Sequence, residues 1–226
     1  MDEEAKKIFD QYERRKNDER IKKQSKDFYF NHYAQSEREL KYQEILKKKY
    51  SSLDSVSILE IGAGTGINLY FFKKLGLKWE NIHANELLED RIIQLKENFP
   101  IIEIYEGDGR CILPEKESTF DIIFQSTVFT SILDNHVKKE LALKMWSLLK
   151  PGGIILWYDF VYNNPKNNDV KGIKIPEIKK LFPEYDKISF NKVTLAPFIG
   201  RRIKKFYPFI NLLPFLRTHI IAVIQK

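Results

Sequence analysis

The sequence is poor in the residues that build disulfide frameworks and metal clusters. Its 226 residues include one cysteine, Cys111, and four histidines that lie far apart in the chain. A single cysteine excludes an internal disulfide and fits a reducing compartment. Because no acidic pair has the spacing of a metal site either, we predict no bound metal.

Long apolar runs are also lacking. No uncharged apolar stretch approaches the roughly 20 residues that a membrane-spanning helix needs. The first ten residues are charged and lack the apolar core of a signal peptide. With 43% hydrophobic and 31% charged residues, the composition is typical of a globular protein, so we expect a soluble, cytoplasmic chain with one large domain.

Positive charge is in excess, with 38 lysines and arginines against 31 acids, a net charge of +7. Such a surface attracts phosphates, acidic glycans or anionic lipid headgroups. Charge is dense in residues 1–50, which we predict to be a helical arm or lid. An aromatic cluster near its middle, from Phe28 to Tyr33, has the composition of a segment that folds over a ligand.

From residue 51 onward, apolar runs of two kinds alternate. Strand-like runs are followed by stretches with helical spacing, a pattern typical of a doubly wound, mostly parallel α/β sheet covered on both faces. The expected strands are 57–61, 81–85, 101–105, 120–125 and 154–159, and the expected helices are 67–75, 88–98 and 135–149. A short helix at 176–182 precedes two late strands, 185–195 and 218–224, which we expect to pair as an antiparallel hairpin around an insertion at 196–217.

A glycine-rich turn follows the first expected strand. It has the pattern E-x-G-x-G-x-G, running from Glu60 through Gly62 and Gly64 to Gly66. Glycines allow a tight turn and close approach of a ligand, and the next helix offers free N–H groups. A dinucleotide fingerprint would need glycine where Ile67 stands. Since a carboxylate at Glu60 is unfavourable beside a pyrophosphate but suits an ammonium and a sulfonium, the turn favours S-adenosylmethionine over NAD.

Two more acids follow the next two strands. Glu86 is positioned to accept hydrogen bonds from the hydroxyls of a ribose, each worth roughly 1.5–3 kcal/mol. Asp108 is positioned to accept one from an adenine amino group. Each acid alone is equally compatible with a turn or cap role. Ligands bind at the carboxyl ends of parallel strands, so three acids there predict one cofactor site.

These motifs carry a family resemblance. Residues 58–66, 86, 107–110, 120–125 and 149–153 together resemble class I S-adenosylmethionine-dependent methyltransferases. Residues 127–134, 157–172 and 193–226 resemble a bacterial subgroup associated with surface-polysaccharide biosynthesis, in capsule or O-antigen. The resemblance implies a Rossmann-like seven-stranded sheet with an antiparallel last strand. It also implies cofactor contacts from Glu60, Gly62, Ala63, Gly64, Gly66, Glu86, Leu87, Asp108, Gly109, Arg110 and Gln125.

Candidate catalytic residues follow the fourth and fifth strands. Methyl transfer depends on alignment of the acceptor, and a hydroxyl acceptor benefits from a general base. Asp159 is our first candidate for base or acceptor-orienting group, with a turn cap as the alternative. Tyr158 and Asn163 have the chemistry to bind sugar hydroxyls, the alternative being packing or turn formation. His136, at the start of the helix after the fourth strand, is a further catalytic candidate because histidine is a common acid or base, with helix initiation as its alternative role.

The insertion at 196–217 is basic and aromatic and contains no acid. We predict that Arg201 and Arg202 bind the acceptor, because arginine forks suit phosphate. Two other interpretations stay open: peripheral contact with an anionic membrane, and a connection that packs its apolar side on the domain.

The function predicted is O-methylation of a small-molecule or glycan-linked acceptor, including one that bears phosphate. One alternative is an RNA methyltransferase, suggested by the charge but without a recognisable RNA-binding module, so we expect no nucleic-acid partner. The other is a non-catalytic, cofactor-binding partner protein. The sequence makes no prediction of the oligomeric state.

Overall fold

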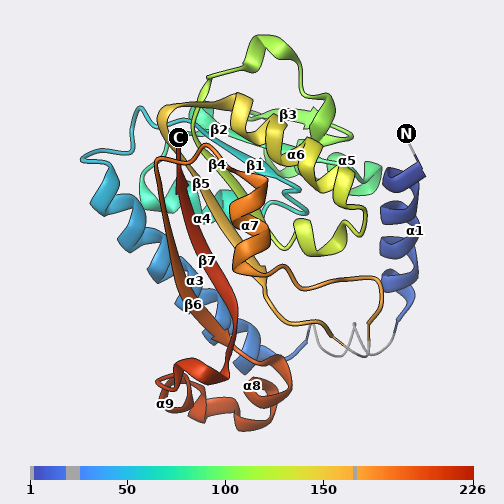
Figure 1. Cartoon of the computed structure of the whole chain (residues 1–226), viewed down its shortest axis with the longest axis vertical. Coiled ribbons are helices and arrows are strands. Elements are labelled where there is room, and N and C mark those ends of the chain that lie inside the picture. The colour runs from blue at the N-terminus through green and yellow to red at the C-terminus, as the bar shows by residue number, and fades with distance from the viewer. Residues whose placement is uncertain (1–2, 19–25, 165–166) are drawn as a thin grey trace.

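A computed structural model describes residues 3–18, 26–164 and 167–226, and its centre is a seven-stranded sheet (Figure 1). The strand order is β3-β2-β1-β4-β5-β7-β6. The strands are β1 (Ile58–Ile61), β2 (Ile82–Glu86), β3 (Glu103–Glu106), β4 (Phe120–Ser126), β5 (Leu149–Phe160), β6 (Lys187–Leu195) and β7 (Arg217–Gln225). Strands β1 to β5 pair in parallel, whereas β7 is antiparallel to both β5 and β6. The predicted fold class and the β6–β7 hairpin are therefore confirmed.

Helices cover both faces of this sheet. They are α1 (Glu3–Asn17), α3 (Phe28–Lys49), α4 (Ile67–Leu75), α5 (Glu89–Asn98), α6 (Asn135–Leu148), α7 (Ile175–Leu181), α8 (Pro197–Ile203) and α9 (Tyr207–Ile210). Alternate residues of each strand point to opposite faces. One face packs with α3, α4 and α5, and the other with α6, α7 and Ile8 of α1. Among the described ranges, no helix has both the length and the apolarity to cross a membrane.

Strand β5 is longer than predicted. The expected start at residue 154 was wrong, because Leu149 already pairs with Phe120 of β4. The pairing register shifts just after Phe120, and Gly152 takes a left-handed φ of 76° that favours glycine. The Pro-Gly-Gly sequence therefore bends a strand that continues through it.

Helix α3 lies within the predicted N-terminal arm and is part of the core. Asp27 caps its start by accepting a hydrogen bond from the backbone N–H of Phe30. Tyr42 and Leu46 are buried against the sheet, and the Tyr42 ring meets Phe124 of β4 edge-on at 5.3 Å. The second half of residues 1–50 thus covers the same sheet that the rest of the chain builds.

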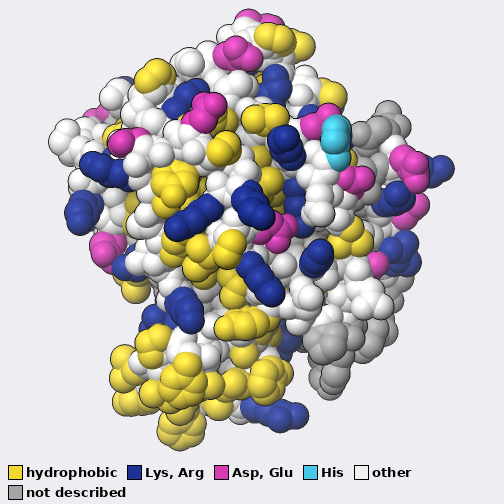
Figure 2. Space-filling model, viewed as in Figure 1, with side chains coloured by type: hydrophobic (Ala, Val, Ile, Leu, Met, Phe, Trp, Pro, Cys, Tyr) yellow, Lys and Arg dark blue, Asp and Glu magenta, His cyan; other side chains and the backbone are white. Residues whose placement is uncertain are grey.

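The insertion between β6 and β7 forms a lobe at one end of the molecule (Figure 1). It contains α8, the 3₁₀ turn Lys204–Phe206, α9 and the 3₁₀ turn Pro214–Leu216. In the space-filling view, hydrophobic side chains gather on this lobe (Figure 2).

We predict that Leu46→Ala destabilises the whole domain. Leu46 is fully buried in the core beneath α3, and truncation of such a leucine costs about 2–5 kcal/mol. Leu40→Ala is the matched control, since Leu40 lies on the same helix with 67% of its surface exposed. Its expected cost is within about 0.5 kcal/mol. Urea unfolding measures both, and equal costs would mean that α3 is not part of the cooperative core.

Candidate active site

A cavity of about 2320 Å³ lies along the edge of the sheet where the parallel strands end. One end is lined by residues of the glycine turn and by the segments after β2 and β3. The other end is lined by the segment after β5, by α8 and by the start of β7. Ile8, Tyr12 and Arg14 of α1 also line it, so the N-terminal helix forms part of the wall.

The three glycines of the turn have different roles. All adopt positive φ, at 66°, 62° and 84° for Gly62, Gly64 and Gly66. A Cβ on Gly66 would lie 2.3 Å from the Phe99 ring, and one on Gly62 would lie 2.7 Å from Val128. A Cβ on Gly64 would meet nothing within 4 Å. Gly66 therefore serves packing and does not line the cavity, whereas Gly64 offers an open backbone to a ligand.

Glu86 ties the end of β2 to the glycine turn. Its Oε2 accepts a hydrogen bond of 2.7 Å from the Gly64 N–H. Its Oε1 accepts hydrogen bonds from the N–H groups of Leu87 (2.9 Å) and Leu88 (3.0 Å). A carboxylate has about four lone-pair sites, so three donors leave Glu86 able to accept one more at the cavity wall.

Glu60 is a buried carboxyl group with one unsatisfied oxygen. Its Oε1 accepts a hydrogen bond of 2.6 Å from Asn68 Nδ2, while Oε2 is buried and has no hydrogen-bond partner. Burial raises the pKa of Glu60 to about 8, and the charge of Glu86 adds to the shift. Because Glu60 lines the cavity, a cationic ligand group would satisfy the oxygen and favour its ionised form.

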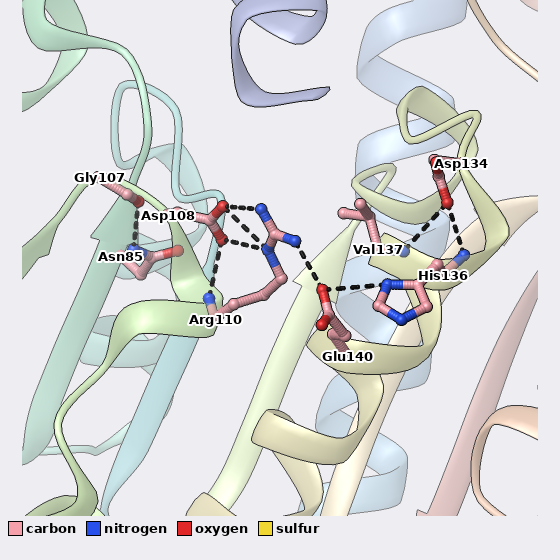
Figure 3. Close-up of polar contacts among 8 residues, drawn as sticks. All are labelled: Asn85, Gly107, Asp108, Arg110, Asp134, His136, Val137 and Glu140. Carbon is pink, nitrogen blue, oxygen red and sulfur yellow. Dashed lines mark hydrogen bonds and ion pairs between the residues drawn. The ribbon is translucent and has the colours of Figure 1, made fainter. Parts of the chain in front are cut away.

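Asp108 follows β3 and is held by Arg110 (Figure 3). It accepts a hydrogen bond from the Arg110 backbone N–H at 2.9 Å and others from the guanidinium, the shortest at 2.6 Å. The guanidinium also donates to Glu140 of α6 at 2.7 Å. Asn85 of β2 donates to the Gly107 carbonyl at 2.9 Å. These contacts fix the loop after β3 against α6 and β2.

Four of the predicted side chains do not line the cavity. Gln125 is buried and bonds Val128 N–H and the Tyr158 carbonyl. The Tyr158 hydroxyl lies 3.1 Å from Thr194 Oγ1. His136 is 77% exposed on α6, with Nδ1 3.5 Å from Glu140. Asp159 is the fourth, and the structure does not bring Asp159, Tyr158 and His136 together.

Asp159 reaches the cavity only through a neighbour. It is fully buried and accepts hydrogen bonds from Thr130 Oγ1 (2.6 Å), Thr130 N–H (3.3 Å) and Phe160 N–H (3.2 Å). Burial raises its pKa to about 7. Thr130 lines the cavity, so Asp159 touches the site by way of Thr130, and its bonds to two backbone N–H groups are those of the turn-cap alternative; its role toward an acceptor stays a prediction.

The acceptor-side predictions that do line the cavity are Asn163, Arg201 and Arg202. Asn163 Oδ1 accepts a hydrogen bond of 3.0 Å from Gly172 N–H. Arg201 lies over the Phe30 ring at 5.1 Å, and its buried Nε has no hydrogen-bond partner. Burial lowers the Arg201 pKa. Arg202 is exposed at the same wall.

His219 is a wall residue to which the sequence analysis gave no part in the site. It lines the cavity from β7, stacks on Tyr158 at 5.2 Å and has Nδ1 3.1 Å from Thr218 Oγ1. Burial and the nearby charge of Arg38 lower its pKa to about 3, so the ring is neutral at physiological pH. The feature of the sequence that could have indicated this position was a polar Thr-His pair at the start of an apolar strand.

Comparison with known proteins agrees with this geometry. Residues 58–153 match the family model of the methyltransferase domain. They contain the glycine turn, Glu86 and Asp108. No curated protein matches the sequence.

Solved structures share the fold of most of this chain. A SAM-dependent methyltransferase from Archaeoglobus fulgidus has a TM-score of 0.58 at 16% identity, covering 88% of this chain and 100% of that chain. One from Mesorhizobium loti has 0.58 at 12%, covering 81% and 96%. The 1,6-didemethyltoxoflavin-N1-methyltransferase of Burkholderia thailandensis, solved with its ligand and S-adenosylhomocysteine, has 0.59 at 15%, covering 81% and 76%. The predicted methyltransferase class and cofactor agree with these findings.

Acidic, histidine and cysteine side chains do not converge on a metal site within the described parts of the chain, where no group of three could hold an ion.

We predict that Glu60 makes stability depend on pH. Since burial raises its folded pKa from 4.5 to about 8, the stability it contributes is present below pH 4.5 and is lost as pH rises toward 8. The loss approaches about 1.4 kcal/mol per pH unit within that window. Urea unfolding at pH 5, 6.5 and 8 should show wild type losing stability relative to Glu60→Gln, which keeps the Asn68 contact. Parallel pH profiles for the two proteins would contradict the assignment.

Proposed function

We propose that this chain is an S-adenosylmethionine-dependent methyltransferase whose cofactor lies at the glycine-turn end of the cavity. The observation that carries the proposal is the unsatisfied Glu60 oxygen beside the open Gly64 backbone. When bound, the cofactor supplies a methyl group on a sulfonium, whose departure needs no acid. The chain must then bind the cofactor, align the acceptor and exclude water.

The cofactor-side residues divide this work. Glu60 would neutralise a cationic group of the ligand, and the free acceptor site on Glu86 would take a hydroxyl hydrogen bond. The loop of Asp108, Gly109 and Arg110 forms the neighbouring wall and is held in place by the Asp108–Arg110–Glu140 contacts. Leu87 and Ala63 complete that end of the cavity.

At the other end we propose an acceptor that carries an anionic group, such as a phosphate on a sugar nucleotide or another glycan-linked molecule. Arg201, with its unpartnered Nε, and the exposed Arg202 support this, because guanidinium groups bind phosphate oxygens in a fork. The cavity exceeds the roughly 300–1,000 Å³ of a single small-molecule site, so it has room for cofactor and acceptor. O-methylation in surface-polysaccharide biosynthesis is the role that the sequence resemblance favours.

Acceptor chemistry then depends on positioning. Asp159 orients Thr130 at the cavity wall, and we assign it a positioning role in place of direct proton transfer. Asn163 binds the backbone of Gly172 and so fixes the segment after β5, where the acceptor would lie.

We predict micromolar binding of S-adenosylmethionine and no binding of NADH, measured by isothermal titration calorimetry. Glu86→Ala should weaken cofactor binding roughly 10- to 100-fold, the value of one lost charge-assisted hydrogen bond. Glu89→Ala is the control, because Glu89 is exposed on α5 three residues away and does not line the cavity. Circular dichroism of Glu86→Ala separates loss of binding from loss of folding. A folded wild type that fails to bind the cofactor would refute the proposal.

A second prediction concerns the acceptor. With methyl-labelled cofactor and the sugar-nucleotide fraction of a bacterial extract, label should enter a dialysable product. Arg201→Ala should raise the acceptor KM about tenfold or more, with cofactor affinity unchanged. Lys48→Ala, an exposed site at the far end of α3, should change neither. Label found only in RNA would instead support an RNA methyltransferase, and tight cofactor binding without label in any fraction would support a non-catalytic partner protein.

A further inference from the structure

Large apolar side chains project from the lobe between β6 and β7 (Figure 2). We define the apolar tip as Phe198, Phe206, Phe209, Leu212 and Phe215, which are each 57–74% exposed. Single exposed apolar residues are ordinary, but five within the 21 residues between β6 and β7 form a patch of the kind that contacts proteins or membranes.

The tip is held by the rest of the molecule. Tyr207 is buried, and its ring stacks on Tyr33 of α3 at 5.6 Å and meets Phe30 at 6.1 Å. Its hydroxyl donates to Glu37 and accepts from the Leu195 N–H. A Cβ on Gly200 would lie 2.5 Å from the Phe30 ring, so α8 packs tightly on α3. One side of the lobe is thus anchored, while the apolar tip faces outward.

Cations accompany the apolar tip. Arg202, Lys204 and Lys205 are exposed, and the sequence from 196 to 217 contains no acid. A protein partner that complements this surface would need an apolar face rimmed by acidic residues. An anionic bilayer supplies both features at once, because cations pair with its headgroups while aromatic side chains enter the headgroup–acyl boundary.

The apolar tip also borders the cavity. Phe198, Arg201, Arg202 and Phe215 belong to the lobe and line the acceptor end of the cavity. A molecule anchored in a membrane beneath the tip would therefore reach the cavity without leaving the lipid.

We propose that the lobe docks this protein on an anionic lipid bilayer through the apolar tip and its lysines. Docking itself does not depend on methyl transfer. Presentation of the acceptor from the membrane rests on the function proposed above. The acceptor would then belong to a class of molecules that carry a lipid anchor.

The test is co-sedimentation of the full chain with vesicles, without cofactor or acceptor. Binding is expected to vesicles of phosphatidylglycerol mixed with phosphatidylcholine, and to be weak with phosphatidylcholine alone. Phe206→Ser/Phe209→Ser and Lys204→Glu/Lys205→Glu should each lower the partition coefficient on the order of tenfold or more. None of these four residues lines the cavity.

Matched variants keep the experiment specific. Ile101→Ser/Leu143→Ser removes exposed apolar side chains elsewhere, and Lys47→Glu/Lys48→Glu reverses charge at the other end of α3. Both controls should bind vesicles as wild type does. Equal binding to both vesicle types, or equal losses in tip and control variants, would overturn the proposal.

Light scattering without vesicles tests whether the apolar tip binds a second copy of the chain instead of a bilayer. A dimer that Phe206→Ser/Phe209→Ser dissociates, together with no vesicle binding, would overturn membrane docking. Because the cofactor titration is a separate measurement, failure of vesicle binding would leave the proposed methyl transfer standing, and the reverse also holds.

Discussion

The reversal of strand order between β1 and β4 is the constraint on which the site depends. From β1 the chain proceeds outward through β2 and β3, then returns to place β4 on the other side of β1. Helices α4 and α5 consequently cover one face and α6 the other. The loops after β1 and β4 therefore separate at the carboxyl edge and leave a crevice there, the place where open α/β sheets bind ligands. The cavity at this edge, with Glu60 and Glu86 in its wall, is a consequence of topology.

What the sequence predicted well was local in origin. The turn from Glu60 to Gly66 is encoded within seven residues, because positive φ values call for glycine, and the apolar spacing of the next nine residues encodes α4. Glu86 and Asp108 each end or follow a parallel strand, so sheet order alone brings them to one edge. The calorimetric prediction for Glu86 rests on that local encoding. The match of the methyltransferase model over residues 58–153 covers this same part of the chain.

What the sequence did not reveal was set by distant contacts. Tyr158 and Asp159 are neighbours on β5 and must point to opposite faces, where Arg38 of α3 covers the first at 4.6 Å and Thr130 occupies the second at 2.6 Å. Neither contact has a signal in the sequence around β5. The place of His219 in the cavity wall likewise depends on the pairing of β5 with β7. Part of the same wall comes from α1, a helix about fifty residues before β1 in the chain. The alternation of side chains between the two faces of a strand is predictable from the sequence, but the residues that pack on each face are not.

Helix α3 connects the core, the acceptor end and the lobe. Near its C-terminus, Leu46 packs under the sheet. Near its middle, Glu37 Oε2 accepts hydrogen bonds from the Thr194 N–H (2.9 Å) and the Tyr207 hydroxyl (3.1 Å). Thr194 has a φ of 57°, an unfavourable value for a β-branched residue, next to the last residue of β6. The carboxylate of Glu37 thus stabilises the strained end of β6 from which the lobe departs. The same helix carries Arg38 over the Tyr158 ring, which stacks on His219 of the cavity wall, so this one helix contacts the core, the lobe and a residue that supports the acceptor end.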